Sequence, residues 1–166
     1  MAQTLLPADI DDLAAKVVEA NREAGRTIVL AESCTGGLVA GALTEIAGSS
    51  AVLDRGFVTY SNEAKMEMLG VPSDIIETFG AVSIACVWAM AQGALKASRA
   101  DVAVAISGVA GPGGGTATKP VGTVVFARAI RNKEGEPEGE LKRFGDIGRA
   151  EVRRQATLCA LELLLP

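Results

Sequence analysis

The apolar run Val102–Ile106 limits the possible folds more than any other segment of this 166-residue chain. Consecutive apolar residues without polar alternation are typical of a strand that is covered on both faces of its sheet. The shorter run Thr27–Leu30 has the same character. Small, branched apolar residues together with 19 glycines favour strands and helices in close contact. We therefore expect an α/β protein.

Apolar periodicity and turn residues divide the rest of the chain. The predicted helices span 10–24, 38–46, 61–69, 74–79, 83–95 and 149–165, with one helical turn at 49–53, and the predicted strands span 27–30, 56–60, 102–106, 121–129 and 141–144. Helices between strands predict parallel pairing, whereas the charged segment 131–140 predicts a hairpin with an antiparallel strand. We expect a single domain over residues 1–166, with a mixed, mainly parallel sheet between helical layers.

Charge and cysteine content restrict the partners and the compartment. The net charge is −4 and no segment concentrates basic residues, which argues against nucleic-acid binding. Three widely spaced cysteines, Cys34, Cys86 and Cys159, lack zinc-ligand spacing and suit a reducing compartment. There is no apolar stretch of about 18 residues and no signal-peptide pattern. We expect a cytoplasmic protein that contacts neither membrane nor nucleic acid.

The chain contains no histidine. This excludes the Ser-His-Asp and Cys-His hydrolase mechanisms, HExxH metalloproteases and most catalytic zinc sites. Acid–base chemistry must then come from Lys, Tyr, Asp, Glu, Cys or the substrate itself. We expect neither a metal nor an organic cofactor.

A polar turn, residues 32–37, follows the first predicted strand and opens a helix. A hydroxyl in such a turn is exposed, and the N–H groups of the helix start can hold an oxyanion or a phosphate. Ser33 and Cys34 are the candidate nucleophiles; a cysteine normally needs a positive neighbour, and Cys34 also suits a small packing position. The alternative is a helix cap followed by glycines for close packing.

The second segment, residues 60–65, holds Lys65 one helical turn beyond a strand end. A lysine that is partly removed from water there loses proton affinity and can act as a general base. The alternative is a solvated lysine paired with a nearby glutamate. Ser61 is expected to cap the helix.

The third segment, residues 107–116, contains five glycines. Glycines let the backbone approach an anionic ligand closely, although the loop lacks the Gly-Lys-Ser/Thr ending of a P-loop. A structureless loop is the alternative. Arg149 adds a cation at the start of the last helix, where a ligand phosphate or carboxylate would explain it. Arg153 and Arg154 are expected on a solvated face.

Several long motifs together carry a family resemblance. They are AESCTGG (31–37), GSSAVLDRGFVTYSNEAK (48–65), LGVPSDIIETFGAVS (69–83), SGVAGPGGGT (107–116) and KPVGTV (119–124). From about Asp9 to Leu165 the chain resembles the C-terminal domain of the competence/damage-inducible protein CinA, in its stand-alone form. One departure is Gly148, which replaces an aspartate that the family often has before the arginine matched by Arg149.

The resemblance implies a three-layer α/β/α sandwich that forms homo-oligomers. It also implies a nicotinamide-nucleotide amidase, which hydrolyses nicotinamide mononucleotide to nicotinate mononucleotide and ammonia in pyridine-nucleotide salvage. Its serine–lysine pair falls on Ser33 and Lys65. Two alternatives stay open: a nucleotide-sensing module without turnover, and a partner-binding accessory domain in which the glycine loops are only structural.

These observations define a candidate site. Tyr60 is expected to steer the Lys65 proton or to stack near the pyridinium, and N–H groups at the start of the second helix are expected to hold the oxyanion. The expected catalytic residues are Ser33, Lys65 and Tyr60, and the expected substrate-binding residues are Cys34, Thr35, Gly36, Gly37, Ser107, Gly108, Gly111, Gly114 and Arg149.

Overall fold

Five strands form one mixed sheet in the computed structural model, which describes residues 3–135 and 137–166. The strands are β1 (Ile28–Glu32), β2 (Leu53–Val58), β3 (Val102–Gly108), β4 (Thr123–Ile130) and β5 (Glu138–Arg143), in the order β2-β1-β3-β4-β5. β1 pairs in parallel with β2 and β3, whereas β4 pairs antiparallel with β3 and β5. The sheet is mixed, as predicted, but its pairings are two parallel and two antiparallel, because loops rather than helices connect β3, β4 and β5.

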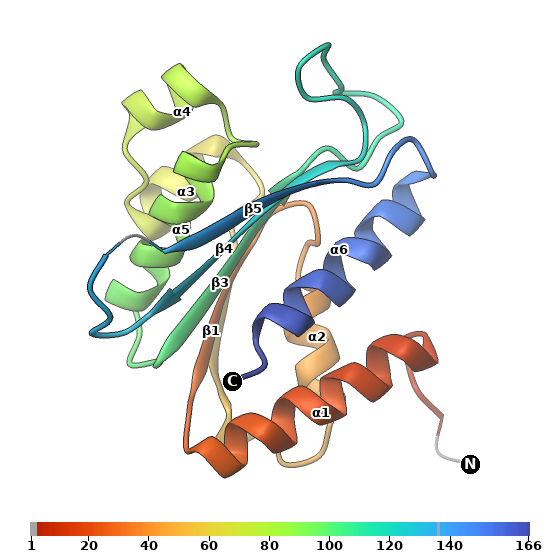
Figure 1. Ribbon diagram of the computed structural model, residues 1–166, viewed down its shortest axis with the longest axis vertical. Coiled ribbons are helices and arrows are strands. Elements are labelled where there is room, and N and C mark those ends of the chain that lie inside the picture. The colour runs from red at the N-terminus through yellow and green to blue at the C-terminus, as the bar shows by residue number, and fades with distance from the viewer. Residues whose placement is uncertain (1–2, 136) are drawn as a thin grey trace.

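Helices cover both faces of this sheet. They are α1 (Ala8–Ala24), α2 (Leu38–Thr44), α3 (Asn62–Leu69), α4 (Ser73–Phe79), α5 (Ile84–Lys96) and α6 (Arg149–Leu163), with a short 3₁₀ turn η1 (Ser49–Ala51) before β2. Figure 1 shows α1, α2 and α6 on one face and α3, α4 and α5 on the other. The element order is the one that the sequence predicts.

Alternate residues of β3 enter two separate cores. Val104 and Ile106 belong to the core beneath α1, α2 and α6, whereas Ala103 and Ala105 belong to the core beneath α5. All four side chains are fully buried, as the apolar run predicts for a strand covered on both faces. The small alanines let α5 pack close to the sheet, while the bulkier residues fill the other core.

The two edge strands differ from their predicted bounds. β2 begins at Leu53 and ends at Val58 rather than spanning 56–60, and β5 begins at Glu138 rather than at 141. Most residues of both strands are exposed, so charged side chains occupy positions that would be apolar in a central strand. Backbone pairing with β1 and β4 defines these strands, and apolar patterning does not reveal it.

The chain changes direction across the sheet between β1 and β3. From β1 it passes through α2 to the edge strand β2, and it then returns through α3, α4 and α5 to β3 on the other side of β1. In open α/β sheets, ligands bind beyond the carboxyl ends of the strands at such a point. The ends of β1 and β3 are therefore where a site is expected. Among the described residues, no helix is long and apolar enough to cross a membrane.

Candidate active site

Ser33 and Lys65 lie in direct contact beyond the end of β1. The side-chain nitrogen of Lys65, Nζ, is 2.9 Å from Ser33 Oγ and donates to the carbonyls of Thr59 at 2.8 Å and Tyr60 at 3.2 Å. Ser61 caps α3 by accepting from the Ala64 N–H, as predicted, which orients the first turn that carries Lys65. The two residues come from separate segments that the strand order brings together.

The surroundings of Lys65 favour its neutral form. The residue is 1% exposed, and within the described residues it has no carboxylate partner. Burial lowers the pKa of Lys65, against smaller opposing contributions from the thiols of Cys86 and Cys34. The alternative of a solvated lysine paired with a glutamate is therefore wrong. A neutral amine at hydrogen-bond distance from a hydroxyl is the arrangement that a serine nucleophile requires.

Cys34 lines the same cleft but its thiol is held protonated. Burial raises its pKa to about 11, with a further small increase from Glu32. Because the thiolate is the reactive form, a thiol with this pKa is a poor nucleophile at neutral pH. Of the two candidates in this turn, Ser33 is the one with an adjacent base.

Glu32 organises the turn, a role that the sequence argument did not assign. Its buried carboxylate accepts from the Thr35 hydroxyl at 2.6 Å and from the N–H groups of Val39 and Ala40 at 3.0 and 3.1 Å. A carboxylate at the start of α2 satisfies unpaired N–H groups and interacts favourably with the helix dipole. The sequence signal that could have revealed this role is an acidic residue at the end of an apolar strand.

The first four N–H groups of α2, from Leu38 to Gly41, all have acceptors among the described residues. Besides the two held by Glu32, the N–H groups of Leu38 and Gly41 donate to the carbonyls of Thr35 and Gly37. These four N–H groups are therefore not available to hold the oxyanion, and α2 packs on the opposite face of the sheet from Lys65.

Three expected substrate-binding residues of this turn lie outside the cleft. Thr35 is fully buried with its hydroxyl bonded to Glu32, and Gly36 and Gly37 line a separate hollow beside α2. Arg153 fastens the turn from α6: its guanidinium donates to the carbonyls of Cys34 at 3.0 Å and Thr35 at 3.4 Å. The sequence predicted that Arg153 lies on a solvated face, and these bonds show that this prediction is wrong.

Tyr60 and Arg149 meet at the mouth of the cleft. The Arg149 guanidinium donates to the Tyr60 hydroxyl at 3.0 Å and to the Gly111 carbonyl at 2.8 Å. The part of Tyr60 that contacts Lys65 is its main-chain carbonyl, not its phenol. Tyr60 is 60% exposed, so its ring is available to a ligand. No hydrogen bond joins the Tyr60 phenol to Lys65 within the described residues, so the expected proton steering has no direct contact to support it.

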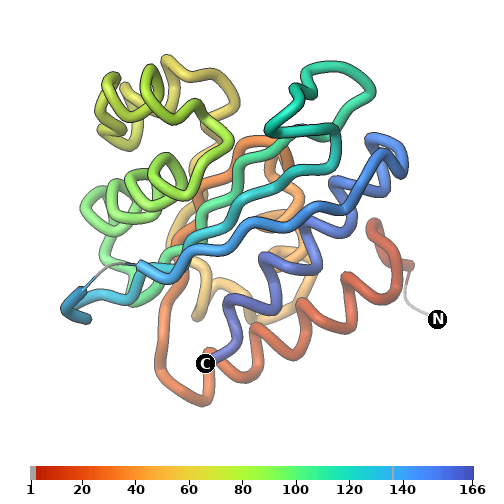
Figure 2. The backbone as a smooth tube through the Cα atoms, turned by 45° about the horizontal axis from the view of Figure 1, so that its top comes forward, coloured from red at the N-terminus to blue at the C-terminus, as the bar shows by residue number. Residues whose placement is uncertain are grey.

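The cleft has a volume of about 290 Å³ and lies between the glycine loop and the α3–α5 side. Figure 2 shows the loop between β3 and β4 standing beside the ends of β1 and β3. Nine residues of the predicted set line it: Ser33, Cys34, Tyr60, Lys65, Ser107, Gly108, Gly111, Gly114 and Arg149. Gly108 has a packing reason as well, since a Cβ there would meet Val124 Cγ2 at 2.8 Å.

The cleft also contains residues that the sequence argument did not name. They are Asn62, Ala81, Val82, Val109, Ala110 and Gly113. Asn62 follows the Ser61 cap in the motif of residues 48–65, so the sequence argument could have included it. The segment before α5 had no polar signal, so only the fold places Ala81 and Val82 here.

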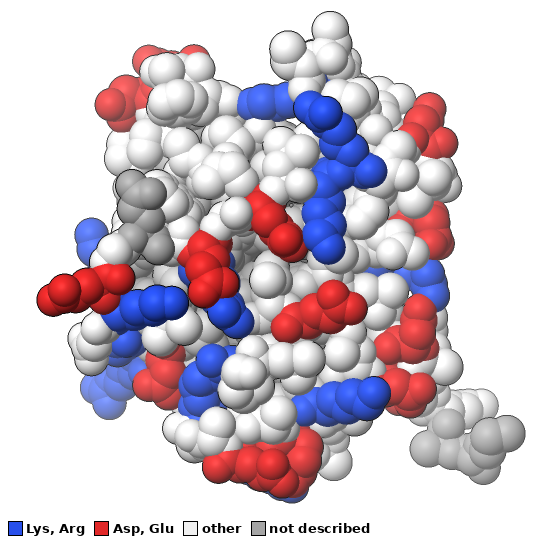
Figure 3. All heavy atoms as spheres, viewed as in Figure 1, with Lys and Arg blue, Asp and Glu red and all other residues white. Residues whose placement is uncertain are grey.

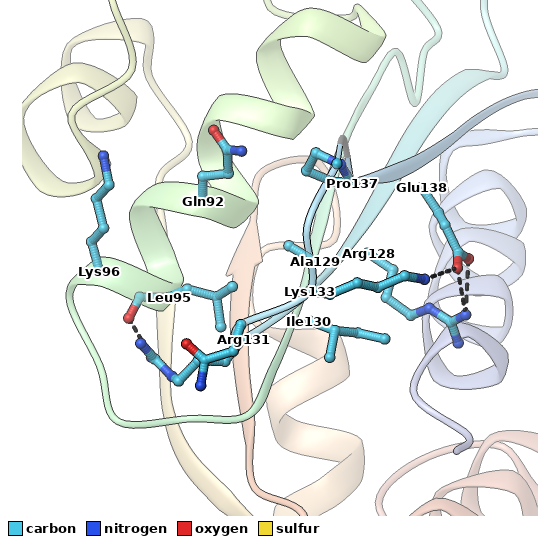
Figure 4. Close-up of a pocket in the computed structure, with 12 residues that line it drawn as sticks. Gln92, Leu95, Lys96, Arg128, Ala129, Ile130, Arg131, Lys133, Pro137 and Glu138 are labelled. Atoms are coloured by element: carbon cyan, nitrogen blue, oxygen red, sulfur yellow. Dashed lines mark hydrogen bonds and ion pairs between the residues drawn. The ribbon is translucent and has the colours of Figure 1, made fainter.

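A larger cavity of about 340 Å³ lies at the other end of the sheet, near the β4–β5 hairpin (Figure 4). Its guanidinium groups bond within the protein: Arg131 donates to the Leu95 carbonyl, and Arg128 pairs with Glu138. None of the described residues that line it form a nucleophile–base pair. Elsewhere in the described residues, no cluster of three or more His, Cys, Asp or Glu side chains could hold a metal ion. The chemistry therefore points to the Ser33 cleft.

The comparisons with known proteins all indicate the same family. Residues 10–166 match the family model of the CinA C-terminal domain. Nicotinamide-nucleotide amidohydrolase PncC of Escherichia coli (strain K12) is 54% identical over 95% of this chain and 93% of its own length. Its namesake from Enterobacter agglomerans is 50% identical over 94% and 93%.

A solved structure has the same fold. The competence/damage inducible protein CihA from Agrobacterium tumefaciens superposes with a TM-score of 0.93 at 54% identity, covering 98% of this chain and 97% of that one. The match in sequence and structure over nearly the whole length leaves one assignment: this chain belongs to the CinA C-terminal domain family.

Proposed function

We propose that this protein is a nicotinamide-nucleotide amidohydrolase, which converts nicotinamide mononucleotide to nicotinate mononucleotide and ammonia. The observation that carries the proposal is the 2.9 Å contact between Ser33 Oγ and the buried Lys65 Nζ. It supplies a nucleophile and a base to a chain without histidine. The relatives named for this activity match almost the whole chain.

In the proposed acylation step, neutral Lys65 removes the proton of Ser33 as Ser33 Oγ attacks the carboxamide carbon. The C–N bond of the resulting tetrahedral intermediate then breaks, and Lys65 donates the proton to the departing ammonia. The carbonyls of Thr59 and Tyr60 hold the amine in place through both transfers. Lys65 ends this step neutral, ready for the next.

In the deacylation step, Lys65 takes a proton from water as the water oxygen attacks the nicotinoyl ester on Ser33. The ester C–O bond then breaks, Lys65 returns the proton to Ser33 Oγ, and nicotinate mononucleotide is released. The cationic pyridinium disfavours a second positive charge nearby and therefore keeps Lys65 neutral. Stacking on the exposed Tyr60 ring, a cation–π contact, would hold the pyridinium at the mouth of the cleft.

The phosphate is assigned to the glycine loop and Arg149. Thr35 and Gly36 are excluded because they lie outside the cleft, whereas Gly111, Gly114 and Arg149 line it. On the face drawn in Figure 3, basic side chains gather in a run near this loop, although the chain is acidic overall. Arg149 is the cation that lines the cleft, and a local positive charge there suits an anionic nucleotide.

Ammonia release from nicotinamide mononucleotide by the purified protein tests this function. We expect turnover, with nicotinate mononucleotide as the other product. A thermal shift with the nucleotide but no ammonia would instead support the nucleotide-sensing alternative. The assembly into homo-oligomers and the action of residues 1–166 as one domain stay predictions.

A further inference from the structure

Ser107 lies beside Ser33 on the same face of the sheet. β1 and β3 pair in parallel with Glu32 opposite Ile106, and the Ser33 N–H donates to the Ile106 carbonyl at 2.9 Å. The next residue of each strand is therefore a serine. Ser107 is paired with Val125, which belongs to the α5-side core, and Ser33 contacts Lys65 on this same side. The register places two hydroxyl groups next to each other.

The Ser107 hydroxyl is unused by the protein itself. The residue is 2% exposed and lines the cleft. No side-chain hydrogen bond within residues 3–135 and 137–166 involves its Oγ, which is not among the fully buried unpaired polar atoms and therefore stays open to the cleft. A hydroxyl that is free of protein partners can donate one hydrogen bond and accept others. Its position therefore makes it available to a group that enters the cleft.

Lys65 and Ser107 flank Ser33 from opposite sides. Lys65 Nζ is bonded to the carbonyls of Thr59 and Tyr60, which directly follow β2. Ser107 is the last residue but one of β3, and β1 lies between these two strands. The leaving nitrogen of a tetrahedral intermediate on Ser33 must face Lys65 to receive its proton. Its oxygen then points away from Lys65, toward the β3 side.

We infer that the Ser107 hydroxyl donates the hydrogen bond that stabilises this oxyanion. The inference rests on the proposed amidase function. It assigns that stabilisation to Ser107 rather than to the N–H groups of Leu38–Gly41 in the first turn of α2, which are already bonded. No proton is transferred: the hydroxyl donates a hydrogen bond that strengthens as negative charge develops on the oxygen, and Lys65 remains the base.

Steady-state kinetics of Ser107→Ala on nicotinamide mononucleotide test the inference. Losing one oxyanion donor lowers kcat by about 10²–10³-fold in other hydrolases, and we expect a fall of that order with KM changed less than about threefold. The pH at half-maximal kcat/KM should stay where it is, because Ser107 does not contact Lys65. Ser98→Ala, a serine at the far end of α5, is the matched control and should keep wild-type kinetics.

An aldehyde analogue of the nucleotide, with CHO in place of the carboxamide, provides a binding readout. It forms a tetrahedral adduct with Ser33, so Ser107→Ala should weaken its inhibition by the same factor as kcat/KM while leaving product affinity unchanged. Ser107→Cys, nearly isosteric with a weaker donor, should fall between the two and also serves if the alanine variant folds poorly.

Three results would overturn the inference: unchanged kcat in Ser107→Ala, a raised KM with normal kcat, or a shifted pH profile. The first denies any role, the second indicates ground-state binding only, and the third indicates action through Lys65. Wild-type protein that releases no ammonia would instead refute the proposed function, so the two failures are distinguishable.

Discussion

At the scale of single residues, the burial of Lys65 bears on both its role as a base and the stability of the protein. Removing an amine from water disfavours its charged form, and burial lowers the pKa of Lys65. We therefore expect kcat/KM to rise with pH as Lys65 loses its proton, with a midpoint below the ordinary lysine range. A pH–rate profile of ammonia release measures it. A midpoint at the ordinary lysine value would show that Lys65 is not the limiting base.

The same burial predicts a pH-dependent stability. The pKa of Lys65 is lower in the folded state, so between the folded and unfolded values the unfolded chain binds more protons, and the free energy of unfolding rises with pH. Below the folded value the cost of burying the amine is fully present. Lys65→Met should remove this slope, so its stability relative to wild type should be highest at low pH and fall as pH rises. Urea titrations across pH measure it; parallel wild-type and variant curves would contradict it.

Cys34 is predicted to be dispensable for turnover. Its thiol, with a pKa of about 11, stays protonated where Lys65 can act as a base. Cys34→Ala should keep kcat within about threefold and lose about 1 kcal/mol of stability from the lost packing. A loss of kcat beyond 100-fold in folded Cys34→Ala protein would return the nucleophile role to the thiol.

At the scale of elements, the carboxylate of Glu32 joins β1 to α2. Glu32→Gln keeps one acceptor but turns an N–H donor toward the helix start, which should cost about 1–3 kcal/mol of unfolding free energy. Glu23→Gln, on the exposed surface of α1, is the control and should stay within about 0.5 kcal/mol. Equal stabilities of the two variants by urea denaturation would show that the Glu32 bonds contribute nothing net.

The contact between α3 and α5 depends on Gly93. A Cβ at this position would lie 1.9 Å from the Leu69 carbonyl oxygen, so Gly93→Ala must push the helices apart. We expect a loss of about 2–3 kcal/mol despite the better helix propensity of alanine. Gly41→Ala in α2, where a Cβ meets nothing, should gain up to about 1 kcal/mol. Thermal unfolding compares them, and a stabilised Gly93→Ala would refute the close contact.

Elements differ in how far their sequence predicts them. The central strands follow from apolar runs such as Val102–Ile106, because burial on both faces leaves no other composition. The edge strand Leu53–Val58 was misplaced because its pairing is made by backbone atoms while its side chains face water. The start of α3 at Ser61 followed from helix capping, which depends on local chemistry.

At the scale of the whole molecule, the strand order brings the residues of the site together. Ser33 and Lys65 were candidates because a chain without histidine leaves few bases and both residues follow strand ends, and the family resemblance then implied that they form a pair. The roles of Glu32, Ser107 and Arg153 depend on which strands and helices are neighbours, and no local pattern contains that information. The same topology sends Thr35, Gly36 and Gly37 to the α2 side, where the sequence alone could not place them.

The most direct test of the account is ammonia release from nicotinamide mononucleotide, with chelator present, by wild type and Ser33→Ala side by side. The account predicts turnover by the wild type and a loss on the order of 10⁴-fold or more in a folded Ser33→Ala variant, because the attacking oxygen is gone. Ser33→Ala protein that retained near-wild-type turnover would contradict the assignment of Ser33 as the nucleophile, and with it the mechanism built on the Ser33–Lys65 pair.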